Sequence, residues 1–157
     1  MSNPLIVTAP EGLPFVDFER VIDAPVAEVF RAHADPELVK QWMGPAIYET
    51  EIERWDYVTG GSWRYISHGP NGEEFPFHGS FHTVRENEFA IQTFEFEPVP
   101  DTASIESLRF EDLGDGRTRL VGHAVYPSLE ARDGMVNSGM EGGMSEGYTR
   151  LENLLAA

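Results

Sequence analysis

The stretch from residue 128 to residue 157 reads SLEARDGMVNSGMEGGMSEGYTRLENLLAA, and it predicts the element on which the fold depends. Apolar side chains recur in it at spacings of three and four, which places them on one side of a helix. They are Val136, Met140, Met144, Tyr148, Leu151 and Leu155. Polar and charged residues fill most positions between them, so the sequence predicts one long C-terminal helix with an apolar stripe.

Five glycines interrupt this predicted helix, at positions 134, 139, 142, 143 and 147. Each glycine inside a helix costs up to about 1 kcal/mol relative to alanine, so the helix needs a partner surface to be stable. A position without a side chain lets a backbone or a ligand come close, and methionine fills irregular space. We therefore expect Gly139, Gly143 and Gly147 to lie where the helix approaches a sheet or a cavity.

Two short helices and a run of strands are predicted ahead of this helix. Residues 23–25 (DAP) and 35–37 (DPE) each combine an acidic cap candidate with a proline in the first turn. Residues 15–22 have strand propensity, and strand-like runs alternate with Gly-, Asn- and Asp-rich turns over residues 46–126. The predicted order is one strand, two short helices, about six strands and the long helix.

This order predicts an α+β fold in which a curved antiparallel sheet wraps around the long C-terminal helix. An antiparallel sheet with one solvated face needs cover on the other, and only the C-terminal helix is long enough to give it. Residues 1–157 are expected to form a single domain. Residues 1–14 contain three prolines and predict an extended lead-in, whose segment 5–7 pairs at a sheet edge. A cavity is expected wherever the curved sheet and the helix fail to meet.

The composition excludes several classes of function. A formal net charge of −16 argues against nucleic acid and anionic membrane surfaces as partners. The chain has no cysteine, which excludes disulfides, thiolate metal sites and a cysteine nucleophile. It has no apolar run of the roughly 18 residues that a membrane span requires, and no basic region with a long apolar run at its N-terminus, so we expect a cytoplasmic protein. The sequence leaves the oligomeric state open, and a homodimer is one of the states that it allows.

Histidines do not indicate a metal site. His78 and His82 lie on one face of a predicted strand, but four residues apart, which is about 13 Å along a strand and too far for one ion. The sequence also has no G-x-S-x-G nucleophile motif and no phosphate-binding loop with its lysine. We therefore expect neither a metal nor a cofactor.

Four segments carry a family resemblance: residues 19–45 (ERVIDAPVAEVFRAHADPELVKQWMGP), 55–65 (WDYVTGGSWRY), 77–84 (FHGSFHTV) and 132–155 (RDGMVNSGMEGGMSEGYTRLENLL). They resemble the SRPBCC superfamily, and most closely its branch related to the activator of heat-shock protein 90 ATPase. The resemblance spans residues 5–155 and implies a START-like, helix-grip fold. It implies a function among hydrophobic ligand carriers, polyketide cyclases and aromatases, and co-chaperone domains.

The aromatic and methionine side chains of the predicted sheet and helix favour an apolar cavity over a solid interior. Met140 and Met144 are one helical turn apart and should face the same part of the sheet. The full set of expected cavity residues is Trp42, Trp63, Tyr65, Phe77, Phe81, Phe94, His123, Met140 and Met144. Among them, Trp42 is placed at the cavity mouth by the resemblance.

General acid–base chemistry is the best enzymatic option, because an apolar cavity raises the pKa of any carboxyl group that it holds. Glu95, Glu106, His78 and His123 lie in predicted strands and are the candidates, although no catalytic residue can be assigned from sequence. Glu95 faces solvent if its neighbouring phenylalanines face the core. Small neighbours on both sides of His123 are expected to leave space beside it.

Three functions remain open. The first is the binding of a small hydrophobic or aromatic molecule in the cavity. The second is a polyketide cyclase- or aromatase-like enzyme that uses one buried polar residue for proton transfer. The third is a co-chaperone-like module for protein interaction. An inward-facing ionisable group would favour the second, and a sealed interior with a broad exposed apolar patch would favour the third.

Overall fold

The computed structural model describes residues 3–157, so the first two residues of the predicted lead-in lie outside the described part. The elements along the chain are β1 (Ile6–Thr8), β2 (Phe15–Ile22), α1 (Val26–Ala34), α2 (Pro36–Trp42), β3 (Glu49–Trp55), β4 (Ser62–His68), β5 (Glu74–Arg85), β6 (Phe89–Phe96), β7 (Ser104–Asp112), β8 (Thr118–Val125), α3 (Leu129–Val136) and α4 (Met140–Ala156). This order confirms the predicted sequence of elements up to the last strand, β8.

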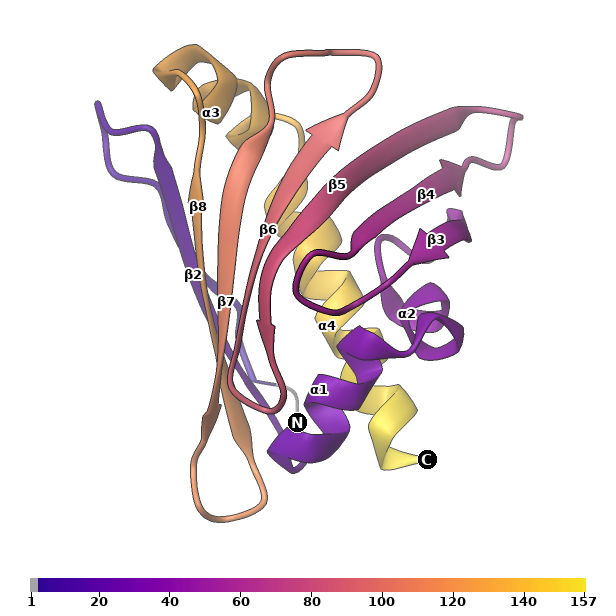
Figure 1. The fold of residues 1–157 in the computed structure, drawn as a ribbon, viewed down its shortest axis with the longest axis vertical. Coiled ribbons are helices and arrows are strands. Elements are labelled where there is room, and N and C mark those ends of the chain that lie inside the picture. Colours follow the sequence, from indigo (N-terminus) through magenta and orange to yellow (C-terminus); the bar gives the residue numbers. More distant parts are fainter. Residues whose placement is uncertain (1–2) are drawn as a thin grey trace.

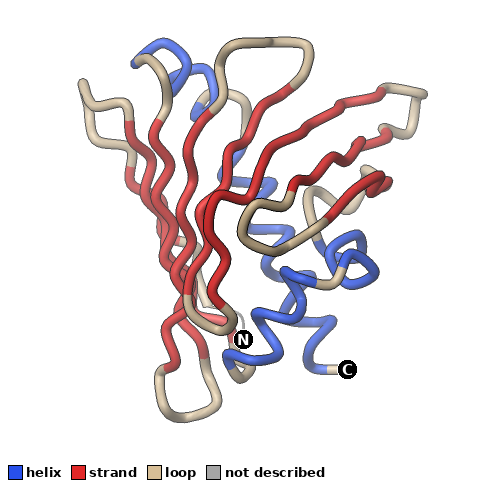
Figure 2. The backbone as a smooth tube through the Cα atoms, in the orientation of Figure 1, coloured by secondary structure: helices blue, strands red, loops and turns tan. Residues whose placement is uncertain are grey.

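The strands form one antiparallel sheet in the order β1-β2-β8-β7-β6-β5-β4-β3. The sheet is strongly curved, and helices α1, α2 and α4 lie on its concave side (Figures 1 and 2). Register shifts interrupt the β3–β4 and β5–β6 pairings, and such irregularities increase the local twist of a sheet. The predicted α+β fold, a curved sheet around a C-terminal helix, is therefore confirmed.

The C-terminal stretch forms two helices, so the prediction of one continuous helix over residues 128–157 is wrong. Helix α3 begins after Ser128, whose hydroxyl accepts a hydrogen bond from the Ala131 amide at 3.0 Å. Gly139, directly before α4, has a φ of +88°, a left-handed conformation that favours glycine and ends the helical path. Helix α4 then runs along the concave side of the sheet, while α3 lies at one end of it (Figure 1).

One side-chain cap and two tryptophans position the two short helices. The Asp35 side chain accepts a hydrogen bond from the Glu37 amide and caps α2, as predicted. Helix α1 begins after Pro25 without a side-chain cap, so the expected capping by Asp23 is wrong. At the other end of α1, the indole N–H groups of Trp42 and Trp55 donate to the carbonyl oxygens of Ala32 and His33, at 3.0 and 2.8 Å. These two bonds satisfy carbonyl groups that the end of a helix leaves free.

Helix α1 fills one half of the concave face with a close-packed core. Its Phe30 contacts Phe110 of β7 edge-on, with ring centroids 5.2 Å apart. Ile22 and Leu120, from β2 and β8, are fully buried in the same cluster. Helix α1 does not fill the other half of the concave face and reaches it only with His33 at its C-terminal end, and this half is where the site is found.

A buried ion pair fixes α4 to the sheet. The Arg20 side chain on β2 is 1% exposed, and its Nη2 lies 2.6 Å from Oε1 of Glu152 on α4. The other carboxylate oxygen of Glu152 accepts a hydrogen bond from the Asp23 amide at 3.1 Å. Arg150 of α4 donates to the carbonyl oxygens of Gln41 and Gly44, which holds the loop after α2 against the helix.

Across residues 3–157, no helix is both long and apolar enough to cross a membrane.

Candidate ligand-binding cavity

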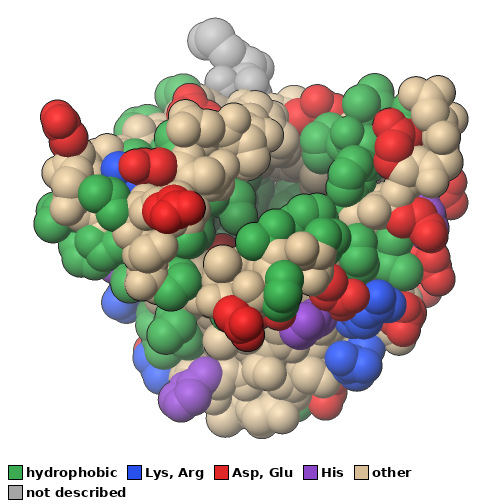
Figure 3. All heavy atoms as spheres, turned by 90° about the horizontal axis from the view of Figure 1, so that it is seen from above, with side chains coloured by type: hydrophobic (Ala, Val, Ile, Leu, Met, Phe, Trp, Pro, Cys, Tyr) green, Lys and Arg blue, Asp and Glu red, His purple; other side chains and the backbone are tan. Residues whose placement is uncertain are grey.

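A cavity of about 450 Å³ lies between the concave face of the sheet and the N-terminal half of α4. The loop of Met43, Gly44 and Pro45 after α2 closes one side of it. Two of the wall residues on α4 are Gly143 and Gly147, whose missing side chains let this loop lie close to the helix. Seen from above, the molecule is hollowed, and hydrophobic side chains surround the opening (Figure 3).

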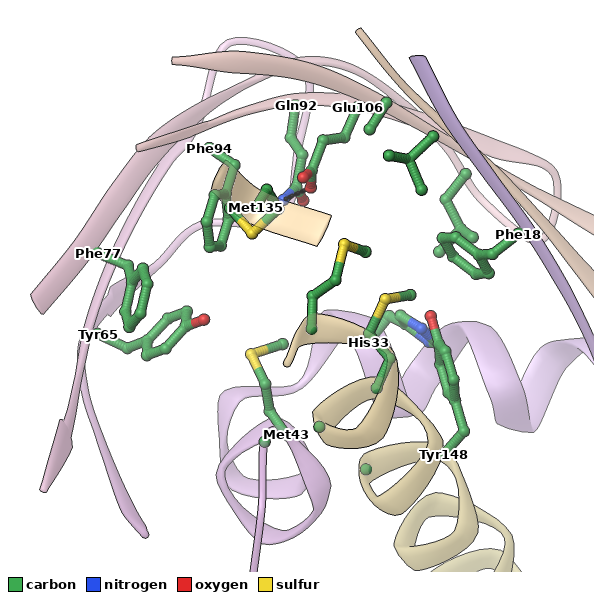
Figure 4. Close-up of a pocket in the computed structure, with 18 of the residues that line it drawn as sticks. Phe18, His33, Met43, Tyr65, Phe77, Gln92, Phe94, Glu106, Met135 and Tyr148 are labelled. Atoms are coloured by element: carbon green, nitrogen blue, oxygen red, sulfur yellow. Dashed lines mark hydrogen bonds between the residues drawn. The ribbon is translucent and has the colours of Figure 1, made fainter. Parts of the chain in front are cut away.

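One wall of the cavity is a continuous layer of aromatic rings from three neighbouring strands. Trp63 and Tyr65 of β4 stack with centroids 5.4 Å apart, Tyr65 and Phe77 of β5 are 5.1 Å apart, and Phe77 and Phe94 of β6 are 5.3 Å apart. These residues face inward because alternate side chains of a strand point to the same face. The close-up in Figure 4 shows Tyr65, Phe77 and Phe94 along this side of the cavity.

The opposite wall is rich in methionine. The chain has five methionines, and the four apart from Met1 all line the cavity: Met43, Met135, Met140 and Met144. Their unbranched side chains adapt to ligands of different outline. The sequence predicts Met140 and Met144 in the cavity wall but not Met43 and Met135. Met135 could have been predicted because it is close in sequence to Met140 and Met144. Nothing in the sequence indicates Met43, because it follows a separate helix, α2.

Glu106 of β7 is the acidic side chain that lines the cavity. One of its carboxylate oxygens accepts a hydrogen bond from Nε2 of Gln92 at 3.2 Å, and the other accepts one from the Ser104 hydroxyl at 3.3 Å. Burial raises the pKa of Glu106 to about 7, although these two hydrogen bonds act to lower it. Figure 4 shows Gln92 and Glu106 together on the sheet side of the cavity. A carboxyl group in this setting exchanges its proton near neutral pH.

The buried tyrosines and His33 of the cavity wall are neutral at pH 7. Burial raises the pKa of the Tyr65, Tyr126 and Tyr148 hydroxyls, and the negative charge of Glu106 raises each further. Burial lowers the pKa of His33 to about 4. Its Nδ1 donates to the Val29 carbonyl oxygen at 2.8 Å, which leaves Nε2 as an acceptor; among the described residues this buried nitrogen has no partner.

Eight of the nine predicted cavity residues lie in the cavity wall: Trp42, Trp63, Tyr65, Phe77, Phe94, His123, Met140 and Met144. Phe81 does not, because the end of β5 that carries it lies over the close-packed half of the sheet. There its fully buried ring contacts Trp55 and Tyr57, with centroids 5.4 and 4.8 Å away.

His123 reaches the wall through its stretch of β8, but its imidazole points to the other face of the sheet. Nδ1 pairs there with the Asp17 carboxylate across the β2–β8 ladder. The expectation of free space beside His123 is also wrong, because a side chain at Gly122 would collide with the Phe18 ring. The missing side chain of Gly122 therefore makes room for Phe18, which itself lines the cavity.

The remaining acid–base candidates lie outside the cavity. His78 and Glu95 form a pair 3.6 Å apart, and Nδ1 of His78 also lies 2.9 Å from Glu97. The neighbouring Phe94 lines the cavity, so alternation along β6 places Glu95 on the opposite face, as predicted. Among residues 3–157, no group of three or more His, Asp or Glu side chains is arranged to hold a metal ion.

Comparison with protein families gives the identity of the fold. The model described as "Activator of Hsp90 ATPase homolog 1-like protein" matches residues 23–156, which is most of the chain. The chain belongs to this family. The family lies within the SRPBCC superfamily, so the resemblance seen in the sequence is confirmed. No curated protein matches the chain.

Solved structures with the same fold superpose over almost the whole chain. A protein from Rhodobacter sphaeroides is 22% identical, has a TM-score of 0.87 and aligns over 98% of each chain. A protein from Mycobacterium smegmatis is 24% identical, with a TM-score of 0.83 over 97% of each chain. One from Arthrobacter aurescens is 23% identical, with a TM-score of 0.87 over 96% of this chain and 91% of the other. At these identities the likeness establishes the helix-grip fold alone.

Proposed function

We propose that this protein binds a small hydrophobic or aromatic molecule in the cavity between its sheet and α4. The observation that supports the proposal is a space of about 450 Å³ between the sheet and α4 that is lined by aromatic rings and methionines. Ligand sites of roughly 300–1,000 Å³ with mostly apolar walls and a few polar groups are typical of small-molecule binding proteins. The polar residues here are few and grouped around Glu106.

A second function is favoured by a specific observation, the inward-facing carboxyl group of Glu106. A general acid or base works best when its pKa lies near the working pH, and burial gives Glu106 a pKa of about 7. A bound polyketide-like chain with an acidic C–H beside a carbonyl is the kind of substrate on which this group would act. A cyclase- or aromatase-like enzyme is therefore the alternative, and turnover lost in Glu106→Gln with ligand binding retained would favour it.

The third function, a module for protein interaction, has less support. Its expected sign is a sealed interior together with a broad exposed apolar patch. The interior instead contains an open cavity, and the exposed large apolar side chains include Ile6, Val58 and Ile105, which lie on different elements and loops.

The proposed binding can be tested by filling the cavity. Met144→Trp adds volume at a wall residue, so it should abolish the binding of a neutral apolar fluorophore such as pyrene while changing the free energy of unfolding little. In a close-packed core the same substitution would cost about 1–3 kcal/mol of strain. Val58→Trp, at a site that is 52% exposed, is the matched control and should leave pyrene binding intact. A wild type that binds no pyrene, with a strongly destabilised Met144→Trp variant, would show that the interior is solid.

A further inference from the structure

We propose that the molecule held in the cavity is a hydrophobic amine, whose protonated nitrogen pairs with the carboxylate of Glu106. This inference rests on the proposed ligand binding and names the chemical class of the ligand. It follows from the uncompensated charge of Glu106, from the aromatic walls around it and from the charge of the whole chain.

The Glu106 carboxylate has hydrogen-bond donors but no countercharge. Gln92 and Ser104, which donate to its two oxygens, are both neutral. The residues that line the cavity include no Lys or Arg, and the ion pairs formed by residues 3–157 do not include Glu106. A carboxylate withdrawn from water without a partner charge is costly, and a ligand ammonium group removes that cost.

The two donors also distinguish a cationic ligand from a neutral one. Each of them donates to a carboxylate oxygen, an arrangement that stabilises the ionised form of Glu106 rather than the protonated one. Each oxygen of a carboxylate has a second lone pair, which is left for a donor on the ligand. An ammonium group has several N–H donors and a positive charge, so it matches what the protein leaves unfilled.

The aromatic walls favour the same ligand. The rings of Trp63, Tyr65, Phe77 and Phe94 form a continuous layer on the sheet side of the cavity, and Glu106 lies on the same face. A cation near the face of an aromatic ring is attracted by the electron-rich π system, and an aromatic or aliphatic body packs against the same rings. The cavity thus suits an apolar body with one cationic group.

The charges in the cavity and on the whole molecule disfavour anionic ligands such as fatty acids. His33 is the histidine whose ring packs in the wall, and its low pKa of about 4 keeps it neutral at pH 7. The formal net charge of −16 repels anions from the whole molecule and attracts cations. An acid placed in the cavity would bring a second negative charge next to Glu106.

The test uses three ligands of nearly the same shape at pH 8: 2-(1-naphthyl)ethylamine, 2-(1-naphthyl)ethanol and 1-naphthylacetic acid. Displacement of pyrene from the wild-type protein should show the amine binding at least about tenfold more tightly than the alcohol, as expected for a charge-assisted hydrogen bond, and the acid binding most weakly. Glu106→Gln should bring the amine close to the alcohol while pyrene still binds. Glu111→Gln, on the same strand but paired with Arg119 on the outer face, is the matched control and should keep the preference.

Proton release gives a measurement that does not depend on a variant. Amine binding at pH 6 should release close to one proton from Glu106, and at pH 9 none, as measured by calorimetry in buffers of different ionisation enthalpy. Other titratable groups around Glu106 are Tyr65, Tyr126 and Tyr148, with His33 in the same cavity, and all of them stay neutral over pH 6 to 9. Binding of the alcohol should release no proton at either pH.

The outcomes separate this inference from the proposal that it rests on. If pyrene binds but the alcohol or the acid binds as tightly as the amine, the amine inference is wrong and the cavity remains a binding site. If pyrene and all three naphthyl compounds fail to bind, both proposals are wrong.

Discussion

A single alternation along β7 decides the chemistry of Glu106. Ser104, Glu106 and Phe110 point to the concave side, whereas Glu111 points outward and pairs with Arg119. Successive residues of a strand point to opposite faces, so a carboxylate on the outer face of β7 contacts solvent, whereas Glu106 on the inner face is buried and has a pKa of about 7. Individual residues therefore take their roles from the face on which the strand places them.

The stability of the protein should depend on pH through Glu106. Its pKa of about 7 in the folded state lies above the ordinary value of about 4.3 for Glu. The stabilising contribution is therefore complete below about pH 4, and it is lost as the pH rises through 7, when the buried group must ionise. Glu106→Gln removes this loss, so the variant should gain up to about 3 kcal/mol on the wild type between pH 5 and pH 8.

Urea unfolding of both proteins at pH 5 and pH 8 measures this effect. Glu111→Gln serves as the control, because it removes a carboxylate from the outer face of the same strand. A difference between wild type and Glu106→Gln that stays constant over this range would show that Glu106 is not buried in the way described.

At the scale of elements, the three glycines that were expected to mark close approaches have three different roles. A Cβ atom at Gly147 would lie 3.1 Å from the Trp42 carbonyl oxygen, so this glycine does allow a close approach. At Gly143 a Cβ atom would make ordinary contact with Pro45 at 3.6 Å. At Gly139 it would meet nothing within 4 Å, and the residue is needed for its positive φ instead.

These roles predict different responses to alanine. Gly143→Ala should stabilise the protein by up to about 1 kcal/mol, because it lowers the entropy of the unfolded chain and raises helix propensity. Gly139→Ala should destabilise it by about 1–2 kcal/mol through strain in the left-handed conformation. Gly147→Ala should gain nothing or lose stability, because the Trp42 carbonyl must shift.

Chemical unfolding of the three variants measures the order of their stabilities. Gly142→Ala is a useful control, since a Cβ atom there meets open space and should stabilise the helix. Equal gains in stability from alanine at positions 139, 143 and 147 would contradict both the helix break at Gly139 and the close approach at Gly147.

The contact between β2 and α4 depends on the buried pair of Arg20 and Glu152. Glu152→Ala leaves the Arg20 guanidinium unpaired in the interior, which should cost about 3–5 kcal/mol. The double variant Arg20→Met/Glu152→Leu removes both charges and keeps most of the volume, so it should recover most of that loss. Thermal and urea unfolding of the single and double variants measure both effects. A double variant as unstable as Glu152→Ala would show that the hydrogen bonds around the pair, rather than its charges, hold the helix.

At the scale of the whole molecule, the concave face is divided between two tasks. Helix α1 packs one half into a solid core, and α4 crosses the other half at a distance that leaves the cavity. The half with the core supplies stability, so the half with the cavity can tolerate unfilled space. This division explains why Phe81 and Phe77, only four residues apart on β5, belong to different environments.

The charge of the whole molecule leads to a separate prediction. With a formal net charge of −16, the protein should show no measurable binding to duplex DNA at 150 mM salt, since phosphate contacts need clustered Lys and Arg. Fluorescence anisotropy with a labelled duplex measures the binding, and a basic DNA-binding protein serves as the positive control. Micromolar affinity would mean that a local basic surface outweighs the net charge.

The sequence alone was enough for the order of the elements up to β8, the α+β class and the family. These depend on local patterns: hydrophobic periodicity, caps such as Asp35, turn glycines, and segments that resemble one family in the right order. It was also enough to indicate an aromatic and methionine-rich interior, because alternation in β4 and β5 puts Trp63, Tyr65 and Phe77 on one face.

Only the tertiary structure decided which half of the sheet is hollow, which acidic residue faces the hollow and where the C-terminal helix breaks. Each of these depends on partners far away in sequence. Phe81 lies in the core because Trp55 and Tyr57 reach it, and His123 faces outward with Asp17 because of the β2–β8 register. Local patterns determine which residues can form a strand or a helix, but a cavity is defined by surfaces that fail to meet, and that is fixed only when the distant elements pack.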